Sequence, residues 1–403
     1  MKNKEIKELI KLETKRQNEG IELIASENYA SKEVRNACSS ILTNKYAEGY
    51  PGRRYYGGCE FVDKIERLAI KNACDLFGSK FANVQPHSGS QANAAAYHAL
   101  LPNGGKILSL TLNDGGHLTH GSPVSFSSHE YNFVFYALKD GHLDYDEILK
   151  TAKEEKPDLL LAGYSAYPYA IDFKRLSQIA KEVGCLFMVD MAHIAGLVAA
   201  KEHMSPVPYA DVVTSTTHKT LRGPRGGIIL TNDEDFIKKI NSAVFPFYQG
   251  GPLEHIIAAK AICFEEALQP SFKEYIKAVV KNTKACALEF KNLGAVASDS
   301  DNHLFLLNVL DSYGISGKEA QNKLEEIGIT LNKNMIPNDT KKPNETSGLR
   351  IGFAASTTRG CNEEQARKIA NIIHNYLKGT SSTDEAKKEV RSITSRWKKI
   401  TSI

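Results

Sequence analysis

Short apolar runs alternate with amphipathic segments through the middle of the chain, and this alternation limits the possible folds more than any other feature. Strands are predicted at residues 106–110, 133–136, 159–163, 185–190, 210–216 and 227–231. Helices are predicted between two pairs of these strands, at residues 144–155 and 173–183. Apolar strands that alternate with helices favour a mostly parallel sheet that is buried on both faces. We therefore expect an α/β fold with helices covering both faces of the sheet.

The chain has 403 residues, which is long enough for more than one domain. We expect an N-terminal helical arm over residues 1–45, a large domain over 46–270 and a smaller α+β domain over 271–403. The segment after Gly379 ends in a basic amphipathic stretch, which we expect to form a peripheral tail.

Composition and charge exclude several classes of protein. The chain is 42% hydrophobic and 24% charged, which is typical of a globular protein. Its net charge is +4, from 51 basic and 47 acidic residues, and no basic block stands out, so we expect no nucleic-acid partner. We also expect no membrane span, because no run of about 18 apolar residues occurs. The charged first residues lack the apolar region of a signal peptide.

Seven cysteines occur at irregular spacing and without a CxxC pair. This pattern argues against a disulfide framework and against a zinc site, so no metal is expected. Reduced, scattered cysteines are typical of the cytosol, and we expect a cytoplasmic protein.

A candidate chemical site is centred on Lys219, which lies on a predicted turn between an apolar run and a glycine-rich segment. Asp190 ends another apolar strand, and the carboxyl ends of strands in open α/β sheets face the ligand crevice. A buried acid and an amine at neighbouring strand ends suit pyridoxal phosphate, whose aldehyde reacts with a lysine and whose ring nitrogen pairs with a carboxylate. The residues Ser88-Gly89-Ser90 start a predicted helix, where phosphate binds readily. Each part alone is also compatible with an ordinary surface lysine or helix cap.

Residues 44–58 form an irregular segment with four tyrosines, four glycines and two arginines. It shows neither a helical nor a strand period. Loops rich in tyrosine and arginine often line binding sites or interfaces, which favours a functional role over a simple linker.

Six segments together resemble one protein family. They are LIASEN at 23–28, TNKYAEGYPGRRYYGG at 43–58, ANVQPHSGSQAN at 82–93, GGHLTHG at 115–121, DMAHIAG at 190–196 and TTHKTLRGPRGG at 216–227. In this order they resemble serine hydroxymethyltransferase, an enzyme of the aspartate aminotransferase-like fold type I that uses pyridoxal 5'-phosphate. The resemblance extends from about residue 20 to 378.

The resemblance implies roles for individual residues. Those expected to act in catalysis are Lys219, Glu48, Asp190, His117, Tyr56 and Thr216. Those expected to hold the cofactor, besides Lys219, His117 and Asp190, are Ser88, Gly89, Ser90, Ser165, His193, His218, Tyr46, Gly250 and Gly251. Those expected to bind substrate are Ser26, Glu48, Tyr55, Tyr56, Arg350, Leu112, Gly116 and Leu118. Lys219 would carry the covalent link to the cofactor, and Arg350 would bind both oxygens of the substrate carboxylate through its guanidinium fork.

The implied reaction transfers the hydroxymethyl group of L-serine to tetrahydrofolate, the co-substrate, and yields glycine and 5,10-methylenetetrahydrofolate. It would serve one-carbon metabolism and glycine biosynthesis. A homodimer with an active site shared across the interface is also implied, with several loop tyrosines reaching in from the partner subunit.

Two alternatives remain at this point. One is a folate-independent aldolase of the same fold, which needs the same lysine, aspartate and arginine. The other is a binding protein that has kept the scaffold of an enzyme. The presence of Glu48 with Tyr55 and Tyr56 favours the transferase over the first, and the complete set of expected site residues favours an enzyme over the second. Segments 245–252, 333–342 and 353–358 differ from the family pattern.

Overall fold

The structure is a computed structural model that describes residues 3–403, and it divides into two compact units. The large unit comprises Ala30–Ser165 and Ala170–Glu274. The small unit comprises the residues up to Tyr29, Ala166–Tyr169 and Tyr275–Ile403.

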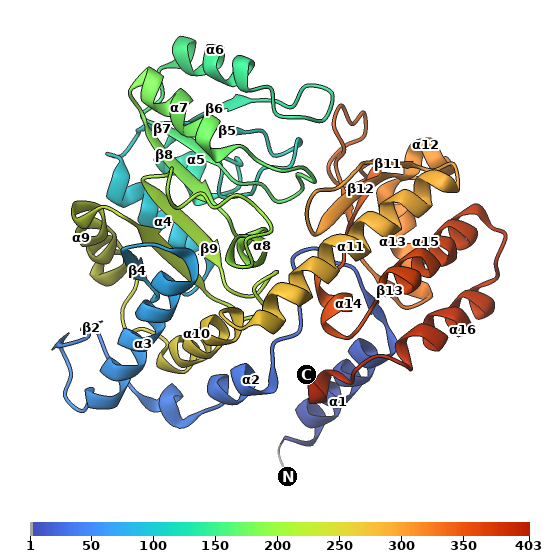
Figure 1. Cartoon of the computed structure of the whole chain (residues 1–403), viewed down its shortest axis with the longest axis horizontal. Coiled ribbons are helices and arrows are strands. Elements are labelled where there is room, and N and C mark those ends of the chain that lie inside the picture. Colours follow the sequence, from blue (N-terminus) through green and yellow to red (C-terminus); the bar gives the residue numbers. More distant parts are fainter. Residues whose placement is uncertain (1–2) are drawn as a thin grey trace. The chain divides into compact units, whose positions relative to one another are not determined.

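A seven-stranded sheet forms the centre of the large unit (Figure 1). In spatial order its strands are β4 (Phe81–Asn83), β10 (Gly227–Thr231), β9 (Val212–Thr216), β8 (Leu186–Asp190), β7 (Leu159–Ala162), β5 (Lys106–Leu110) and β6 (Asn132–Tyr136). Strand β10 runs antiparallel to both of its neighbours, and every other pairing is parallel. The predicted mixed α/β architecture with a mostly parallel sheet is therefore confirmed.

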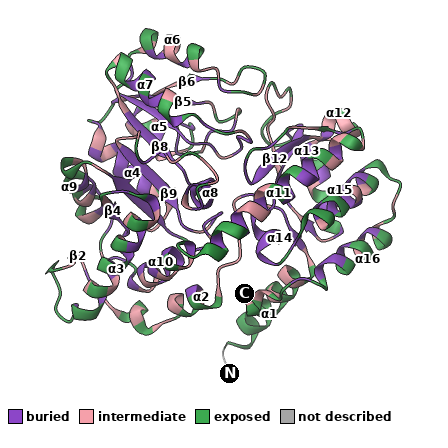
Figure 2. Cartoon of the chain, viewed as in Figure 1, coloured by how far each residue is buried: buried purple, intermediate pink, exposed green. Residues whose placement is uncertain are grey.

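The central strands are buried along nearly their whole length, which explains why β7 and β10 show no alternation of apolar and polar residues (Figure 2). All residues of β7, β9 and β10 are buried, and β8 is buried after its first residue. The helices that pack against the sheet are α4 (Gly89–Leu100), α6 (Tyr145–Glu155), α7 (Phe173–Val183) and α9 (Glu234–Ser242). The carboxyl ends of β8 and β9 meet because these two strands are parallel neighbours, with Asp190 opposite Thr214.

The helices of the large unit are α2 (Lys32–Cys38), α3 (Glu60–Phe77), α4 (Gly89–Leu100), α5 (Phe126–Glu130), α6 (Tyr145–Glu155), α7 (Phe173–Val183), α8 (Ala195–Ala199), α9 (Glu234–Ser242) and α10 (Glu254–Ala267). Five of them begin after a residue whose side chain caps the helix. Ser31, Ser88, Asp144, Asp172 and Asp233 each accept a backbone N–H from the first turn of the helix that follows. Short helical turns η1 (Ile41–Asn44) and η2 (Ala243–Tyr248) and a hairpin of β2 (Gly49–Tyr50) and β3 (Arg53–Arg54) complete the unit.

The small unit contains a four-stranded antiparallel sheet with the order β11 (Val296–Ala297), β12 (Leu304–Asn308), β15 (Gly348–Gly352) and β14 (Asn332–Asn334). Strands β1 (Ile21–Glu22) and β13 (Ile329–Thr330) form a separate parallel pair. Its helical elements are α1 (Lys4–Glu19), α12 (Val309–Tyr313), α13 (Gly317–Glu326), α14 (Ala354–Thr358), α15 (Glu363–Lys378), α16 (Thr383–Thr394) and η3 (Ile400–Ser402). The boundary between the units falls within α11 (Pro270–Asn292).

The expectation of a peripheral tail after Gly379 is wrong. Helix α16 and the residues behind it place Ala386, Val390, Ile393 and Trp397 in the hydrophobic core of the small unit. The basic residues of α16 indicate its exposed face, whereas its burial depends on the apolar face that packs into the core of the folded unit.

Helix α4 begins at Gly89 because Ser88 caps it, in agreement with the helix start predicted at Ser88-Gly89-Ser90. Within residues 3–403, no helix combines the length and the apolar character that crossing a membrane requires.

Candidate active site

Asp190 lies at the carboxyl end of β8 and is held from three directions. Its Oδ2 accepts a hydrogen bond from Asn93 Nδ2 at 2.9 Å, and His120 Nε2 lies 3.2 Å from the same oxygen. Its Oδ1 accepts the backbone N–H of Ala192 at 3.0 Å. The carboxylate is therefore fixed in orientation although it is buried.

The charge of Asp190 follows from these contacts. Burial alone raises the pKa of the carboxyl group, but the hydrogen bond from His120 and the nearby charges of His120, His117 and Lys219 outweigh it. The pKa of Asp190 is consequently well below its ordinary value. A buried, ionised carboxylate suits a partner that carries a proton or a positive charge.

Lys219 is buried on the turn that follows β9. Backbone hydrogen bonds close this turn, from Gly223 N to Thr217 O at 2.7 Å and from Arg222 N to Lys219 O at 3.1 Å. Thr220 links the turn to the segment after β8, because its hydroxyl donates to His193 O at 2.9 Å. The sheet thus holds the backbone of Lys219 next to the end of β8.

A cavity brings the acid and the amine together. Besides Asp190 and Lys219 it is lined by His117, His120, Gly163, Tyr164, Ser165, Ala192 and His193. Gly163 has a φ of 106°, and a Cβ there would lie 1.9 Å from Asp190 O, so a glycine is needed for β7 and β8 to approach at this point.

His117 is fixed beside Asp190 by its own loop. The backbone N–H of Thr119 donates to His117 Nδ1 at 3.2 Å, so in the neutral ring the proton lies on Nε2. The Thr119 hydroxyl lies 2.8 Å from the same nitrogen and accepts a hydrogen bond from Asn93 at 2.8 Å. One asparagine therefore orients both Asp190 and the His117 loop.

The donor set fits pyridoxal phosphate. The site offers an ionised carboxylate for a protonated ring nitrogen and a lysine for an aldehyde, in one cavity. Two further buried polar atoms, Thr216 Oγ1 and His218 Nδ1, have no hydrogen-bond partner among the described residues. Burial, with the charges of Lys219 and Arg225, lowers the pKa of His218 to about 3, so this imidazole is neutral at physiological pH.

The expected phosphate segment lies against the same strands. Ser88 caps α4 by accepting Gln91 N at 3.2 Å, and a Cβ on Gly89 would lie 2.6 Å from Thr216 Cγ2. Ser88 to Ser90 therefore sit beside the end of β9, with the first backbone N–H groups of a 12-residue helix at hand.

A second group of expected site residues gathers around residues 45–58, which we call the tyrosine loop. Tyr46 and Tyr56 pack with ring centroids 4.9 Å apart, and the Tyr46 hydroxyl donates to Glu48 Oε1 at 3.3 Å. A Cβ on Gly250 would lie 3.2 Å from Glu48 Oε1, and one on Gly251 would lie 3.1 Å from Tyr46 Cε1. Tyr55 is 76% exposed and packs against Phe245. None of these residues lines the cavity of Lys219 within the described chain.

The remaining expected substrate residues fall into two groups. Leu112 and Leu118 are exposed, and Gly116 is buried, all in the loop after β5 that carries His117. Arg350 and Ser26 belong to the small unit. Arg350 lies on β15, donates to Asn332 Oδ1 at 3.3 Å, and its burial lowers its pKa to about 10.

Within the small unit, the segment with Ser26 lies against β15. Gly352 N donates to Leu23 O at 2.8 Å, and a Cβ on Gly352 would lie 2.5 Å from Ala25 Cα. The structure therefore brings the segments of Ser26 and Arg350 side by side. A buried guanidinium and a neighbouring hydroxyl are suited to a carboxylate.

Sequence reasoning missed residues that orient the expected ones. These are Asn93, Thr119, His120, Gly163, Tyr164 and Ala192. Asn93, Thr119, His120 and Ala192 stand inside the quoted motifs, so their position in polar motifs at strand ends and helix starts was an available signal. Nothing in the local pattern separates Gly163 from other glycines that follow a strand.

A comparison with models of known protein families matches residues 1–373 of the 403-residue chain to the family described as serine hydroxymethyltransferase.

Proposed function

The chain belongs to the serine hydroxymethyltransferase family, whose members are pyridoxal-phosphate-dependent transferases, and on that premise we propose that it transfers the hydroxymethyl group of L-serine to tetrahydrofolate. The products are glycine and 5,10-methylenetetrahydrofolate. The observation that carries the proposal is the pairing of ionised Asp190 with Lys219 in one buried cavity.

Asp190 and Lys219 have complementary tasks in this proposal. The Asp190 carboxylate would hold a proton on the ring nitrogen of the cofactor, and Lys219 would hold its aldehyde carbon. When bound, pyridoxal phosphate supplies a ring that accepts the electrons released as the Cα–Cβ bond of serine breaks. His117, held by Thr119, provides a flat surface next to Asp190 for stacking.

Other residues bind the ends of the cofactor and the substrate. Ser88, Gly89, Ser90 and His218 serve the phosphate, assisted by Gly250 and Gly251. Ser165, His193 and Thr216 lie close to the cofactor. The Arg350 fork binds the serine carboxylate with Ser26, and Leu112, Gly116 and Leu118 line the substrate side. Glu48 moves the proton of the serine hydroxyl, with Tyr46, Tyr55 and Tyr56 around it.

We further propose a homodimer in which the tyrosine loop completes the site of the partner subunit. The gathering of Tyr46, Glu48, Tyr56, Gly250 and Gly251 away from the lining of the Lys219 cavity supports this arrangement. The fold type I architecture, with a large and a smaller domain, completes the proposal. The irregular spacing of the seven cysteines supports a cytoplasmic location.

The test compares serine cleavage with and without tetrahydrofolate. The proposal expects cleavage of serine to depend on the folate and to yield 5,10-methylenetetrahydrofolate in step with glycine. Equal rates in both conditions would contradict it and would indicate a folate-independent aldolase.

A further inference from the structure

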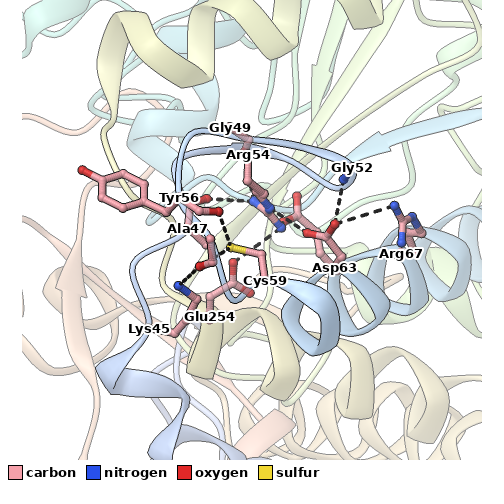
Figure 3. Close-up of polar contacts among 12 residues, drawn as sticks. Lys45, Ala47, Gly49, Gly52, Arg54, Tyr56, Cys59, Asp63, Arg67 and Glu254 are labelled. Carbon is pink, nitrogen blue, oxygen red and sulfur yellow. Dashed lines mark hydrogen bonds and ion pairs between the residues drawn. The ribbon is translucent and has the colours of Figure 1, made fainter.

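Arg54 is the centre of a buried polar network that holds the tyrosine loop to two helices (Figure 3). Its Nη1 donates to Ala47 O at 2.8 Å and to Gly49 O at 3.0 Å, which are the carbonyl groups on either side of Glu48. One guanidinium nitrogen therefore fixes the backbone that carries Glu48.

The remaining donors of Arg54 face acidic side chains. Nε donates to Asp63 Oδ1 at 2.8 Å and Nη2 donates to Glu66 Oε2 at 2.7 Å, both on α3. The other oxygen of Glu66 accepts Gln85 Nε2 at 2.8 Å. The first two acids are thus fully engaged with Arg54 and its neighbours.

Glu254, at the start of α10, is the third acid and differs from the other two. Its residue is 1% exposed, and its Oε1 lies 3.6 Å from Arg54 Nη2, which is longer than a hydrogen bond. Neither of its oxygens has a hydrogen-bond partner among residues 3–403. An ionised carboxylate in this position would be costly, because a buried charge needs close partners.

Charged side chains from α3 and from the tyrosine loop surround Glu254. Glu66 and Asp63 face it from α3, and Arg54 and Lys45 face it from the tyrosine loop. His255 follows it on α10; α2 and η1 also pack on this helix. Burial, reinforced by Glu66, raises the pKa of Glu254 to about 8, and Arg54 opposes this only partly.

We propose that Glu254 is a positioning residue that, as a neutral acid, leaves Arg54 free to hold both backbone carbonyls around Glu48, and that its ionisation pulls the guanidinium away from them. A hydrogen bond to a charged acceptor is about twice as strong as one to a neutral carbonyl. Ionised Glu254 therefore draws Arg54 Nη2 toward its Oε1, and because the guanidinium is rigid and planar, Nη1 moves with it away from Ala47 O and Gly49 O. The link to catalysis rests on the proposed function, through the role of Glu48, whereas the anchoring of the loop does not.

Hydrogen exchange of the peptide that spans residues 45–58 tests the anchoring without any substrate. In the wild-type holoenzyme, after correction for the chemical exchange rate, we expect exchange of this peptide to accelerate by about tenfold between pH 7 and pH 9. Glu254→Gln, an isostere of the neutral acid, is expected to keep the pH 7 protection at pH 9. Glu60→Gln, which changes an exposed acid on α3, is the matched control and is expected to follow the wild type.

A second readout connects the loop to the reaction. The fall of kcat for folate-dependent serine cleavage above pH 8 is expected to be smaller in Glu254→Gln than in the wild type and in Glu60→Gln. Arg54→Lys keeps the charge but lacks the fork, and its loop is expected to exchange fast at both pH values.

Wild-type protection that does not change between pH 7 and pH 9 would overturn the inference, and so would a Glu254→Gln profile that matches the wild type. The pH dependence of exchange in the wild type tests the inference even if a variant fails to fold. Folate-independent cleavage combined with the expected exchange pattern would refute the proposed function and leave the anchoring role of Glu254 in place.

Discussion

Gly163→Ala is expected to destabilise the protein and to displace Asp190 through a steric overlap with backbone atoms. The residue follows β7 with a φ of 106°, and an added Cβ would lie 1.9 Å from Asp190 O and 2.6 Å from Asp190 C. Both atoms belong to backbone, so no side chain can rotate away. The end of β8 must shift, and Asp190 shifts with it.

The expected cost has two parts. A non-glycine residue in such a backbone conformation costs about 1–3 kcal/mol. Forcing extra volume into a packed region adds about 1–3 kcal/mol. Gly184→Ala is the matched control, because Gly184 also has a positive φ, of 76°, but an added Cβ meets no atom within 4 Å. The control is expected to carry only the backbone part of the cost, about 1–3 kcal/mol.

The assay is urea unfolding of both variants, combined with a titration of pyridoxal phosphate followed by its visible absorption. Gly163→Ala is expected to lower the free energy of unfolding by about 1–3 kcal/mol more than Gly184→Ala does, which is the cost of the steric overlap alone. It is also expected to weaken cofactor binding, whereas Gly184→Ala leaves it unchanged. Equal destabilisation with intact cofactor binding would refute the reasoning.

Three further predictions concern the site itself. Lys219→Ala is expected to lose the covalent link to the cofactor, and an unchanged visible spectrum would contradict its assignment. Asp190→Asn is expected to lower kcat by at least about 100-fold, the typical cost of removing a preorganised electrostatic partner. Because the pKa of Asp190 is lowered in the folded protein, its contribution to stability is complete above pH 3.8 and is lost as the pH falls further. The difference in unfolding free energy between wild type and Asp190→Asn should therefore narrow in acid. A difference that stays constant with pH would contradict a lowered pKa for Asp190. Arg350→Lys is expected to raise the KM for serine by about tenfold or more, since lysine cannot bind both carboxylate oxygens; an unchanged KM would exclude Arg350 as the carboxylate anchor.

Local pattern predicted most of the large unit. Strands β5 and β10 and helix α7 have the expected bounds, because continuous apolar runs and 3.6-residue periods are visible without any tertiary information. The placement of Asp190 and Lys219 at neighbouring strand ends also followed from the parallel order, and both line one cavity. The prediction of a peripheral tail was wrong, because the apolar face of α16 belongs to a core that also contains Leu23 and Phe290, which lie far away in sequence.

The sequence by itself determined which residues have reactive chemistry and on which local elements they stand: an amine on a turn, an acid at a strand end and a serine-glycine helix start. Only the tertiary structure decided what surrounds them. Asn93 and His120 reach Asp190 across 97 and 70 residues of chain, and Glu254 at the start of α10 lies beside Arg54 of β3. Local periodicity carries no record of such distant pairs, because hydrogen bonds, burial and the resulting charge states arise only when separate elements pack together.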